Sequence, residues 1–477
     1  MFFSFMLKKQ SNFRKKIIMK KNREHWASSF GFVMAAAGSA IGLGTLWQFP
    51  YMTSQNGGGL FVLLFLLFTI IIGVPVFIAE LILGRKAQRG AVGIFDSLTK
   101  DSGWKISGWL GVLSAFLILS YYCVVAGWGL NYVVLSLNKF YLNKTSREIS
   151  EVFNTMFVSA DVNLLWQIIF LLITAGVVYK GIRQGIERWS RVLTSALLIL
   201  LISLLSYSIT LKGFPEAVKF IFYPDFSKLR PSGILEALGL AFFTLSLGQG
   251  VMLTYGSYMS KDENIPKTAC IVASMNIIIS IFAALMIFPI IFTFGFQPQA
   301  GFGLVFETLP VLFAKLPGAL VLSTLFFILL VFTALTSSVA LLEVLVANLE
   351  DLFSWTRKKA VIYSSVAIFI VGIPVALTGS NILFPNWEIL YGKSFFQTVV
   401  DVVSQWILPL AGLFVAVFSG WKMQKSDLKE EFSSKSGWNK LFAFWFFFTK
   451  WVAPAAIIAI ILQRGGLIDL DLLFHSE

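Results

Sequence analysis

The feature that most constrains this chain is residues 26–79, a run without a single Asp, Glu, Lys or Arg. A run this apolar and this long predicts helix buried in a lipid bilayer, because lipid leaves backbone polar groups no other partner. Its middle reads "GSAIGLGTLWQFP", with Gly38, Gly42 and Gly44 close together. Each glycine weakens a helix by about 1 kcal/mol relative to alanine. The run therefore predicts a membrane span whose helix is interrupted near its centre.

Composition supports a membrane protein with little soluble mass. The 477 residues are 57% hydrophobic and 13% charged, whereas soluble domains carry about 25% charged residues. A soluble enzyme is excluded on these grounds, and with only two histidines we expect no catalytic residues. The net charge of +13 comes from Lys and Arg in loops, which indicates contact with anionic lipid rather than nucleic acid.

Windows of about 20 apolar residues predict an all-α polytopic protein with eleven transmembrane helices. The expected spans are 28–54, 60–84, 106–137, 163–180, 189–211, 232–259, 267–296, 316–350, 360–378, 394–421 and 440–463. Most basic loops fall on the side of the basic tail 1–22, which predicts a cytoplasmic N-terminus by the positive-inside rule. A short tail, 464–477, would then be extracellular. We expect a multi-pass protein of a plasma membrane, specifically a bacterial cytoplasmic membrane.

A second interrupted stretch, "FFTLSLGQG" at residues 242–250, lies five spans after the first. Five is an odd number, so two consecutive five-span units must have opposite orientations. Matching interrupted spans in two halves are typical of inverted-repeat transporters, here residues 23–211 and 232–421, followed by an eleventh span at 440–463. The alternative is that such glycines only allow helices to pack closely, which Gly38 and Gly42 would fit. The hydroxyl residues beside both breaks favour unwound segments, whose carbonyls can bind a cation and whose helix N-termini can bind a carboxylate.

Several motifs resemble the neurotransmitter:sodium symporters, which have the LeuT-type fold. They are "REHWASSFGFVMAAAGSAIGLGTLWQFPY", "QNGGG", "GVPVFIAELILGR", "ALGLAFFTLSLGQG" and "FTALTSSVALLEV", and the similarity runs from residue 23 to about 421. The resemblance implies a 5+5 inverted repeat with broken spans 1 and 6. It also implies Na⁺-coupled import of an amino acid by alternating access, for which a monomer is sufficient.

The resemblance implies two sodium sites. The second site matches Gly38, Ile41 and Thr333 by carbonyl, with Thr336 and Ser337 by side chain. The first site matches Ala40, Thr45, Thr244 and Asn276. Family members usually have Asn at the position of Thr45, so we expect a weakened first site and coupling to a single Na⁺.

The substrate site implied by the family lies between the broken helices. Its matching positions are Ser39, Ala40, Leu43, Gly44, Ile118, Tyr122, Phe243, Thr244, Ser246, Gln249, Ser337 and Leu341. Backbone amides near Leu43 and the Tyr122 hydroxyl would hold a carboxylate, and carbonyls would accept the ammonium. Gln249 replaces the Phe or Met of most relatives, which predicts a neutral substrate with a small or polar side chain.

The gates depart from the family at one end. Arg23, Trp26, Tyr258 and Asp351 match the inner gate, whereas Gln48 replaces the arginine that usually pairs with the acid matched by Asp401. We expect Asp401 to be neutralised by another partner or by a raised pKa. Two further acids lie within spans: Glu80 matches a residue that braces the break in span 6, and Glu343 is either functional or extends toward the cytoplasmic surface.

Chloride-dependent relatives have Tyr and Gln at the positions of Phe65 and Leu240, and chloride-independent ones carry an acid near Ser280. This sequence has neither arrangement, and no chloride requirement is expected. Two other functions remain open: a non-transporting sensory or regulatory protein on the same fold, and an ion channel. A channel would need a continuous polar pore, which the inverted repeat argues against.

Overall fold

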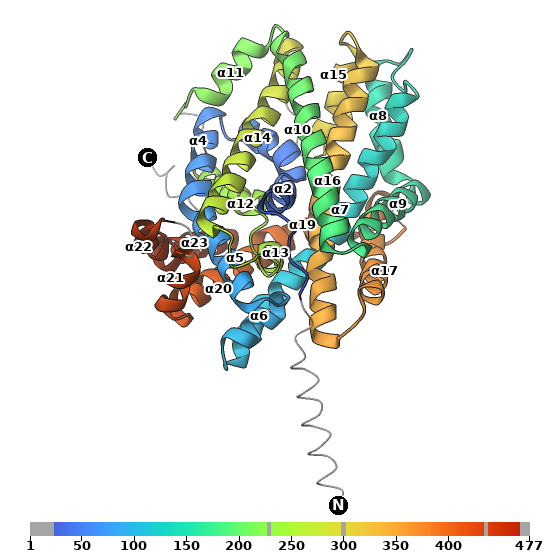
Figure 1. Cartoon of the computed structure of the whole chain (residues 1–477). Coiled ribbons are helices and arrows are strands. Elements are labelled where there is room, and N and C mark those ends of the chain that lie inside the picture. Colours follow the sequence, from blue (N-terminus) through green and yellow to red (C-terminus); the bar gives the residue numbers. More distant parts are fainter. Residues whose placement is uncertain (1–22, 227–229, 297–301, 381, 434–436, 468–477) are drawn as a thin grey trace, which may run out of the picture.

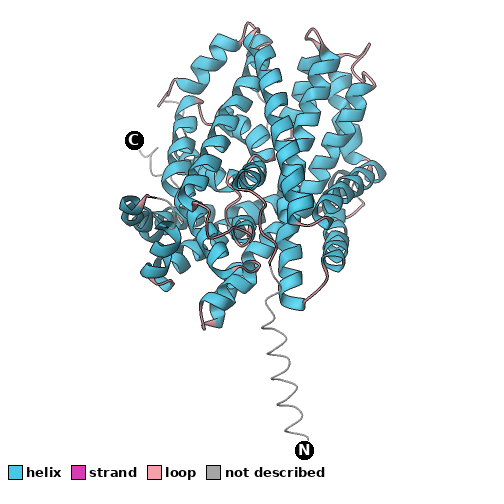
Figure 2. Ribbon diagram, in the orientation of Figure 1, coloured by secondary structure: helices cyan, strands magenta, loops and turns pink. Residues whose placement is uncertain are grey.

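The computed structural model describes residues 23–226, 230–296, 302–380, 382–433 and 437–467, so most of the expected tails 1–22 and 464–477 lies outside the described residues. Within these ranges the ordered elements are helices and the connections are loops (Figures 1 and 2). Helices of the first half are α2 (Ser29–Ala40), α3 (Phe49–Gln55), α4 (Gly59–Phe68), α5 (Val74–Ala87), α6 (Ala91–Leu98), α7 (Lys105–Leu137), α8 (Ser146–Val158), α9 (Ala160–Tyr179), α10 (Arg188–Ile209) and α11 (Phe214–Phe222).

Helices of the second half follow in a similar pattern. They are α12 (Pro231–Thr244), α13 (Val251–Gly256), α14 (Ile265–Thr293), α15 (Leu309–Ala314), α16 (Ala319–Phe353), α17 (Arg357–Ala376), α18 (Trp387–Tyr391), α19 (Phe395–Asp401), α20 (Leu408–Val417), α21 (Lys425–Ser433), α22 (Phe442–Phe447) and α23 (Ala453–Arg464). Several are joined into longer rods by π-helical turns, such as Thr69–Gly73 between α4 and α5 and Val402–Ile407 between α19 and α20.

Nine helical rods among the described residues are long and apolar enough to cross a membrane. A tenth is formed by Ser29–Ala40 and Gly44–Gln55, which meet at a bend of 51°. The expected count of eleven is not confirmed, because span 232–259 is divided into α12 and α13 by residues 245–250. Each half is shorter than the roughly 20 residues that a bilayer requires.

The broken helices lie at the centre of the bundle. Helix α2 packs against α10, α14 and α16, while α16 also packs along α7. Figure 1 shows α2 among these longer helices and α13 below it, where α13 packs against α5 and α16. Helices α8, α11 and α15 lie at one end of the molecule and α6 and α21 at the other. We call the end that contains Arg23 the inner end, and the end that contains Gln48 the outer end.

Candidate functional site

The first break begins where α2 ends. Ile41 leaves the helical conformation with φ −84° and ψ 75°, and the chain resumes as a π-helical turn at Gly44–Gln48. Space also limits the choice of residue, because a Cβ on Gly44 would lie 2.8 Å from the ring of Phe243. The sequence-predicted interruption therefore occurs at the expected place, and the second broken helix lies directly against it.

The second break depends on left-handed backbone. Gly248 and Gly250 have φ of 71° and 69°, which glycine adopts at little cost, and Ser246 is also left-handed with φ 56°. Glu80 on α5 is fully buried, and its Oε1 accepts the N–H of Gly248 at 2.9 Å. This is the bracing contact that the resemblance implied for Glu80.

Hydroxyl groups join the two breaks to α16. The carbonyl of Ser39 accepts hydrogen bonds from the Ser246 and Ser337 hydroxyls, each at 3.1 Å. The Ser39 and Ser246 hydroxyl oxygens lie 3.2 Å apart. The end of α2 is thus held between the second broken helix and α16 by small polar groups.

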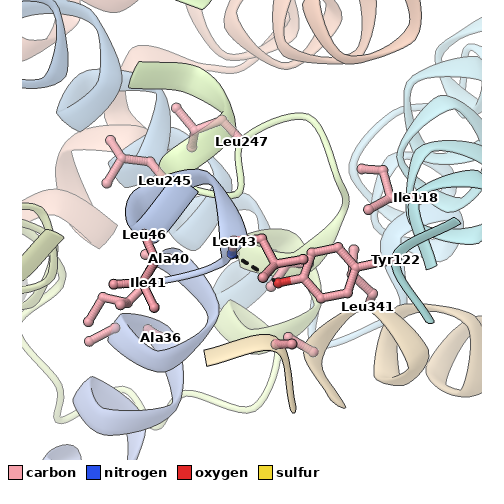
Figure 3. Close-up of a cluster of buried hydrophobic side chains, with 14 of the residues drawn as sticks. Ala36, Ala40, Ile41, Leu43, Leu46, Ile118, Tyr122, Leu245, Leu247 and Leu341 are labelled. Atoms are coloured by element: carbon pink, nitrogen blue, oxygen red, sulfur yellow. Dashed lines mark hydrogen bonds between the residues drawn. The ribbon is translucent and has the colours of Figure 1, made fainter. Parts of the chain in front are cut away.

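A small cavity of about 20 Å³ lies between these elements. Its lining contains all twelve residues of the expected substrate site together with Gly42. The Leu43 N–H donates to the Tyr122 hydroxyl oxygen at 3.1 Å, and Figure 3 shows Tyr122 pointing from α7 toward this amide. Because one water requires about 10–15 Å³, an amino acid enters this space only when its walls move apart.

Four oxygen-bearing residues expected for the first sodium site form one connected cluster. Thr45 Oγ1 lies 3.4 Å from the Ala40 carbonyl oxygen and 3.2 Å from Asn276 Oδ1. The Asn276 amide nitrogen donates to Thr244 Oγ1 at 3.1 Å. All four residues are buried, so these oxygens lie in a site that is shielded from bulk water.

The residues expected for the second sodium site meet where α2 ends against α16. Thr336 Oγ1 donates to the Thr333 carbonyl at 3.0 Å, and Ser337 Oγ lies 3.4 Å from the same oxygen. A Cβ on Gly38 would lie 3.1 Å from the Cβ of Thr336, so the backbones are close together. Ile41 caps the end of α2, and a Cβ on the following residue, Gly42, would lie 2.9 Å from Ser337 Oγ.

The inner end is closed by side chains. Arg23 and Asp351 form an ion pair of 2.7 Å, and the Arg23 guanidinium lies 4.7 Å from the centre of the Tyr258 ring. The Trp26 indole donates to the Tyr255 carbonyl at 3.1 Å. The Trp26 backbone N–H also donates to the Tyr258 carbonyl at 3.2 Å, so all four residues expected for the inner gate come together.

Glu343 takes part in the same closed region. It is fully buried, accepts the Tyr258 hydroxyl at 2.6 Å and forms an ion pair with Arg357. Its side chain is therefore held inside the protein, and it does not extend to the inner surface.

The outer end contains a much larger cavity of about 660 Å³, lined in part by Gln48 and Phe243. The Asp401 carboxylate accepts hydrogen bonds from Lys393 Nζ at 2.6 Å and from Gln397 Nε2 at 2.8 Å. Within the described residues, no hydrogen bond joins Gln48 to Asp401. Lys393 is therefore the other partner that was expected to neutralise Asp401, and it comes from the same outer segment.

Comparison with known proteins decides the family. A model of the sodium:neurotransmitter symporter family matches residues 23–155 and 140–467. The chain belongs to that family. This symporter is 40% identical to an uncharacterized sodium-dependent transporter of Bacillus subtilis, over 93% of this chain and 98% of the relative. It is 35% identical to an uncharacterized sodium-dependent transporter of Haemophilus influenzae, over 93% and 98% of the two chains.

A solved structure agrees with this assignment. The crystal structure of MhsT in complex with L-phenylalanine matches the symporter with a TM-score of 0.85 and 41% identity, over 93% of this chain and 100% of that one. The expected LeuT-type fold is confirmed, and the protein is a sodium-dependent transporter, not an enzyme. Its helices and its bacterial relatives indicate a cell membrane.

Sequence reasoning missed three contributors to the geometry of this symporter. Gly42 lines the cavity, and its place in the interrupted stretch was a usable signal. Arg357 balances the charge of Glu343, and Lys393 balances that of Asp401. Neither pairing has a recognisable spacing in the sequence, because each depends on how a loop folds back.

Proposed function

We propose that this symporter imports a neutral α-amino acid by alternating access, driven by the Na⁺ gradient. The observation that carries the proposal is the cavity between the two broken helices, whose lining among the described residues contains no charged side chain. A charged substrate side chain would be left without a partner there, which costs several kcal/mol. The zwitterion itself needs only backbone groups and hydroxyls, and these are concentrated at the cavity.

The substrate side chain would lie near Gln249, Ile118 and Leu341. The Gln249 amide is buried, and its Nε2 lies 3.5 Å from the Phe243 carbonyl, at the outer limit for a hydrogen bond. A polar group of the substrate would be a better partner for this amide. MhsT, by contrast, was crystallised with L-phenylalanine, so small or polar amino acids and large apolar ones are the alternatives to separate.

The coupled Na⁺ would bind at the second oxygen cluster, and the first cluster would bind Na⁺ more weakly. Hard cations of this size bind oxygens at about 2.3–2.6 Å, which separates neighbouring ligands by roughly 3.3–3.7 Å in an octahedron. Separations of 3.2 and 3.4 Å around Thr45 are close to this range. We further propose that the inner end faces the cytoplasm. Transport would need no chloride, and a monomer would be sufficient for it.

The different closure of the two ends supports alternating access. Ion pairs and aromatic side chains fill the inner end, whereas the 660 Å³ cavity reaches Phe243 from the outer end. Phe243 also lines the small cavity, so its ring lies between the two spaces. This arrangement is suited to a state that receives substrate from outside.

The decisive experiment is uptake into proteoliposomes under an imposed Na⁺ gradient, with twenty amino acids as competitors. We expect saturable accumulation, and loss of the hydroxyl in Tyr122→Phe should weaken substrate affinity about 10- to 100-fold, the effect of a lost bond to a charged group. Tyr121→Phe is the matched control, because its ring packs on Phe396 and it lies outside the cavity lining. Absence of Na⁺-driven accumulation of any amino acid would refute the proposal.

A further inference from the structure

The segment that leads into α2 is held to the start of α10 by two carboxylates, neither of which belongs to the Arg23–Asp351 pair. One is Glu187, which immediately precedes α10, and the other is Glu24, which precedes α2. Each acid accepts at least one backbone N–H of the other segment. The two contacts are therefore reciprocal.

Glu187 binds the beginning of α2. Its Oε2 accepts the Ala27 N–H at 2.7 Å, and its Oε1 accepts the Ser28 hydroxyl at 3.0 Å. Ser28 in turn is the N-cap of α2 and accepts the Gly31 N–H at 3.0 Å. The carboxylate thus lies at the helix end where negative charge is favourable. Glu187 is fully buried, and Arg191 forms an ion pair with it at 3.5 Å.

Glu24 makes the corresponding contact in the other direction. Its two oxygens accept the N–H groups of Ile182 and Arg183, each at 3.0 Å. These residues begin the π-helical turn Ile182–Glu187 that leads into α10. Arg183 Nε also donates to the His25 carbonyl at 2.8 Å. Two bonds to one carboxylate fix both the position and the orientation of the segment.

Gly31 makes room for the Glu187 contact. A Cβ at this position would lie 2.0 Å from Glu187 Oε1, closer than any real contact allows. An alanine at position 31 must therefore displace the carboxylate from the start of α2. This gives a way to break the contact without changing any charge.

We propose that Glu24 and Glu187 form a latch that holds residues 24–28 against α10 and keeps the inner pathway closed. The latch acts in addition to the Arg23–Asp351 pair, and both acids are positioning residues that contact neither substrate nor ion. Trp26 lies inside the latched segment and covers Tyr255, with ring centres 5.1 Å apart. Release of the latch would uncover Tyr255 from the inner side. The meaning of the latch for transport rests on the proposed alternating access, but its effect on closure can be measured without transport.

The test places a cysteine at Tyr255→Cys in a Cys270→Ser background, leaving the fully buried Cys123 in place. A membrane-impermeant thiol reagent is applied, with Na⁺ present, to vesicles in which the inner end faces the medium. Glu187→Gln, Glu24→Gln and Gly31→Ala are each expected to raise the labelling rate about fivefold, the equivalent of about 1 kcal/mol for a lost cap. Glu148→Gln is the matched control, because that acid caps the N-terminus of α8 at the outer end.

The double variant Gly31→Ala/Glu187→Gln should label no faster than the faster single variant, because both substitutions break the same contact. Labelling rates equal to the parent in Glu24→Gln and Gly31→Ala would overturn the latch, as would an equal increase in Glu148→Gln. If Glu187→Gln does not fold, the labelling rates of Glu24→Gln and Gly31→Ala still test whether the latch exists. Because labelling is independent of substrate, failure of amino-acid uptake would contradict the proposed function and leave this result unaffected.

Discussion

Replacement of Thr336 by valine tests the sodium assignment most directly. The hydroxyl of Thr336 donates only within its own helix, to the carbonyls of Thr333 and Phe332 at 3.0 and 3.2 Å. Those carbonyls belong to a continuous helix, so losing the hydroxyl leaves the fold intact. Valine keeps the branched shape of threonine. What the substitution removes is one hydroxyl oxygen from a residue whose Cβ and methyl carbon lie against Gly38 at the end of α2.

The size of the effect follows from the chemistry of that oxygen. A bond from a neutral group to a charged one contributes about 1.5–3 kcal/mol, and each 1.4 kcal/mol is tenfold in an equilibrium constant. We therefore expect the Na⁺ concentration for half-maximal uptake to rise about 10- to 100-fold in Thr336→Val. The equivalent change at the first cluster, Thr45→Val, should have a smaller effect, because threonine reaches less far into that site than the usual asparagine.

The assay is initial amino-acid uptake into proteoliposomes as a function of external Na⁺, at constant ionic strength. Thr45→Val is the comparison variant, since it removes the same group from a buried position in the first cluster. The reasoning would be refuted if Thr336→Val left the Na⁺ dependence within twofold of the parent. A larger shift in Thr45→Val than in Thr336→Val would instead assign the dominant ion to the first cluster.

Two further predictions concern specificity and ions. Gln249→Leu should shift the relative affinity of competing amino acids by about tenfold or more from polar toward apolar side chains, because it removes a buried amide that lines the cavity. Unchanged affinity ratios among twenty competitors would contradict the role of Gln249. Replacing chloride by gluconate should leave Na⁺-driven uptake unchanged, since apolar Phe65 and Leu240 stand where chloride-dependent relatives carry hydroxyl and amide groups; abolished uptake would reverse that expectation.

The two helix breaks could be predicted because their cause is local. Glycines beside hydroxyl residues in an apolar run leave few alternatives to an unwound segment, and Gly248 and Gly250 do adopt left-handed backbone. The span count could not be predicted in the same way. Hydropathy windows do not register how far a helix unwinds, and residues 245–250 divide the sixth expected span into two short helices.

Side-chain pairing across the molecule was the harder problem. Asp401 in an apolar span predicts that some partner must exist, but the identity of Lys393 depends on a loop that brings it within 2.6 Å. The same holds for Glu187, whose contact with Ala27 requires two helices to lie side by side and Gly31 to leave space. For Asp401 the need for a partner was visible in the sequence, whereas the identity of the partner, and the whole Glu187 contact, depend on the three-dimensional arrangement.

Gln48 replaces the usual outer arginine, and this changes the electrostatic cost of opening the outer end relative to the inner end. At the inner end, the Arg23–Asp351 pair joins the segment before α2 to α16, so the pathway cannot open there without separating two charges. At the outer end, Lys393 and Asp401 both belong to the segment that contains α19, so this pair can stay intact while Gln48, which lines the outer cavity from the first broken helix, moves. Opening the outer end therefore costs less electrostatic energy than opening the inner end. That asymmetry is consistent with the large outer cavity and the closed inner end. Under the proposed alternating access, bound substrate and Na⁺ would supply the free energy that releases the inner contacts.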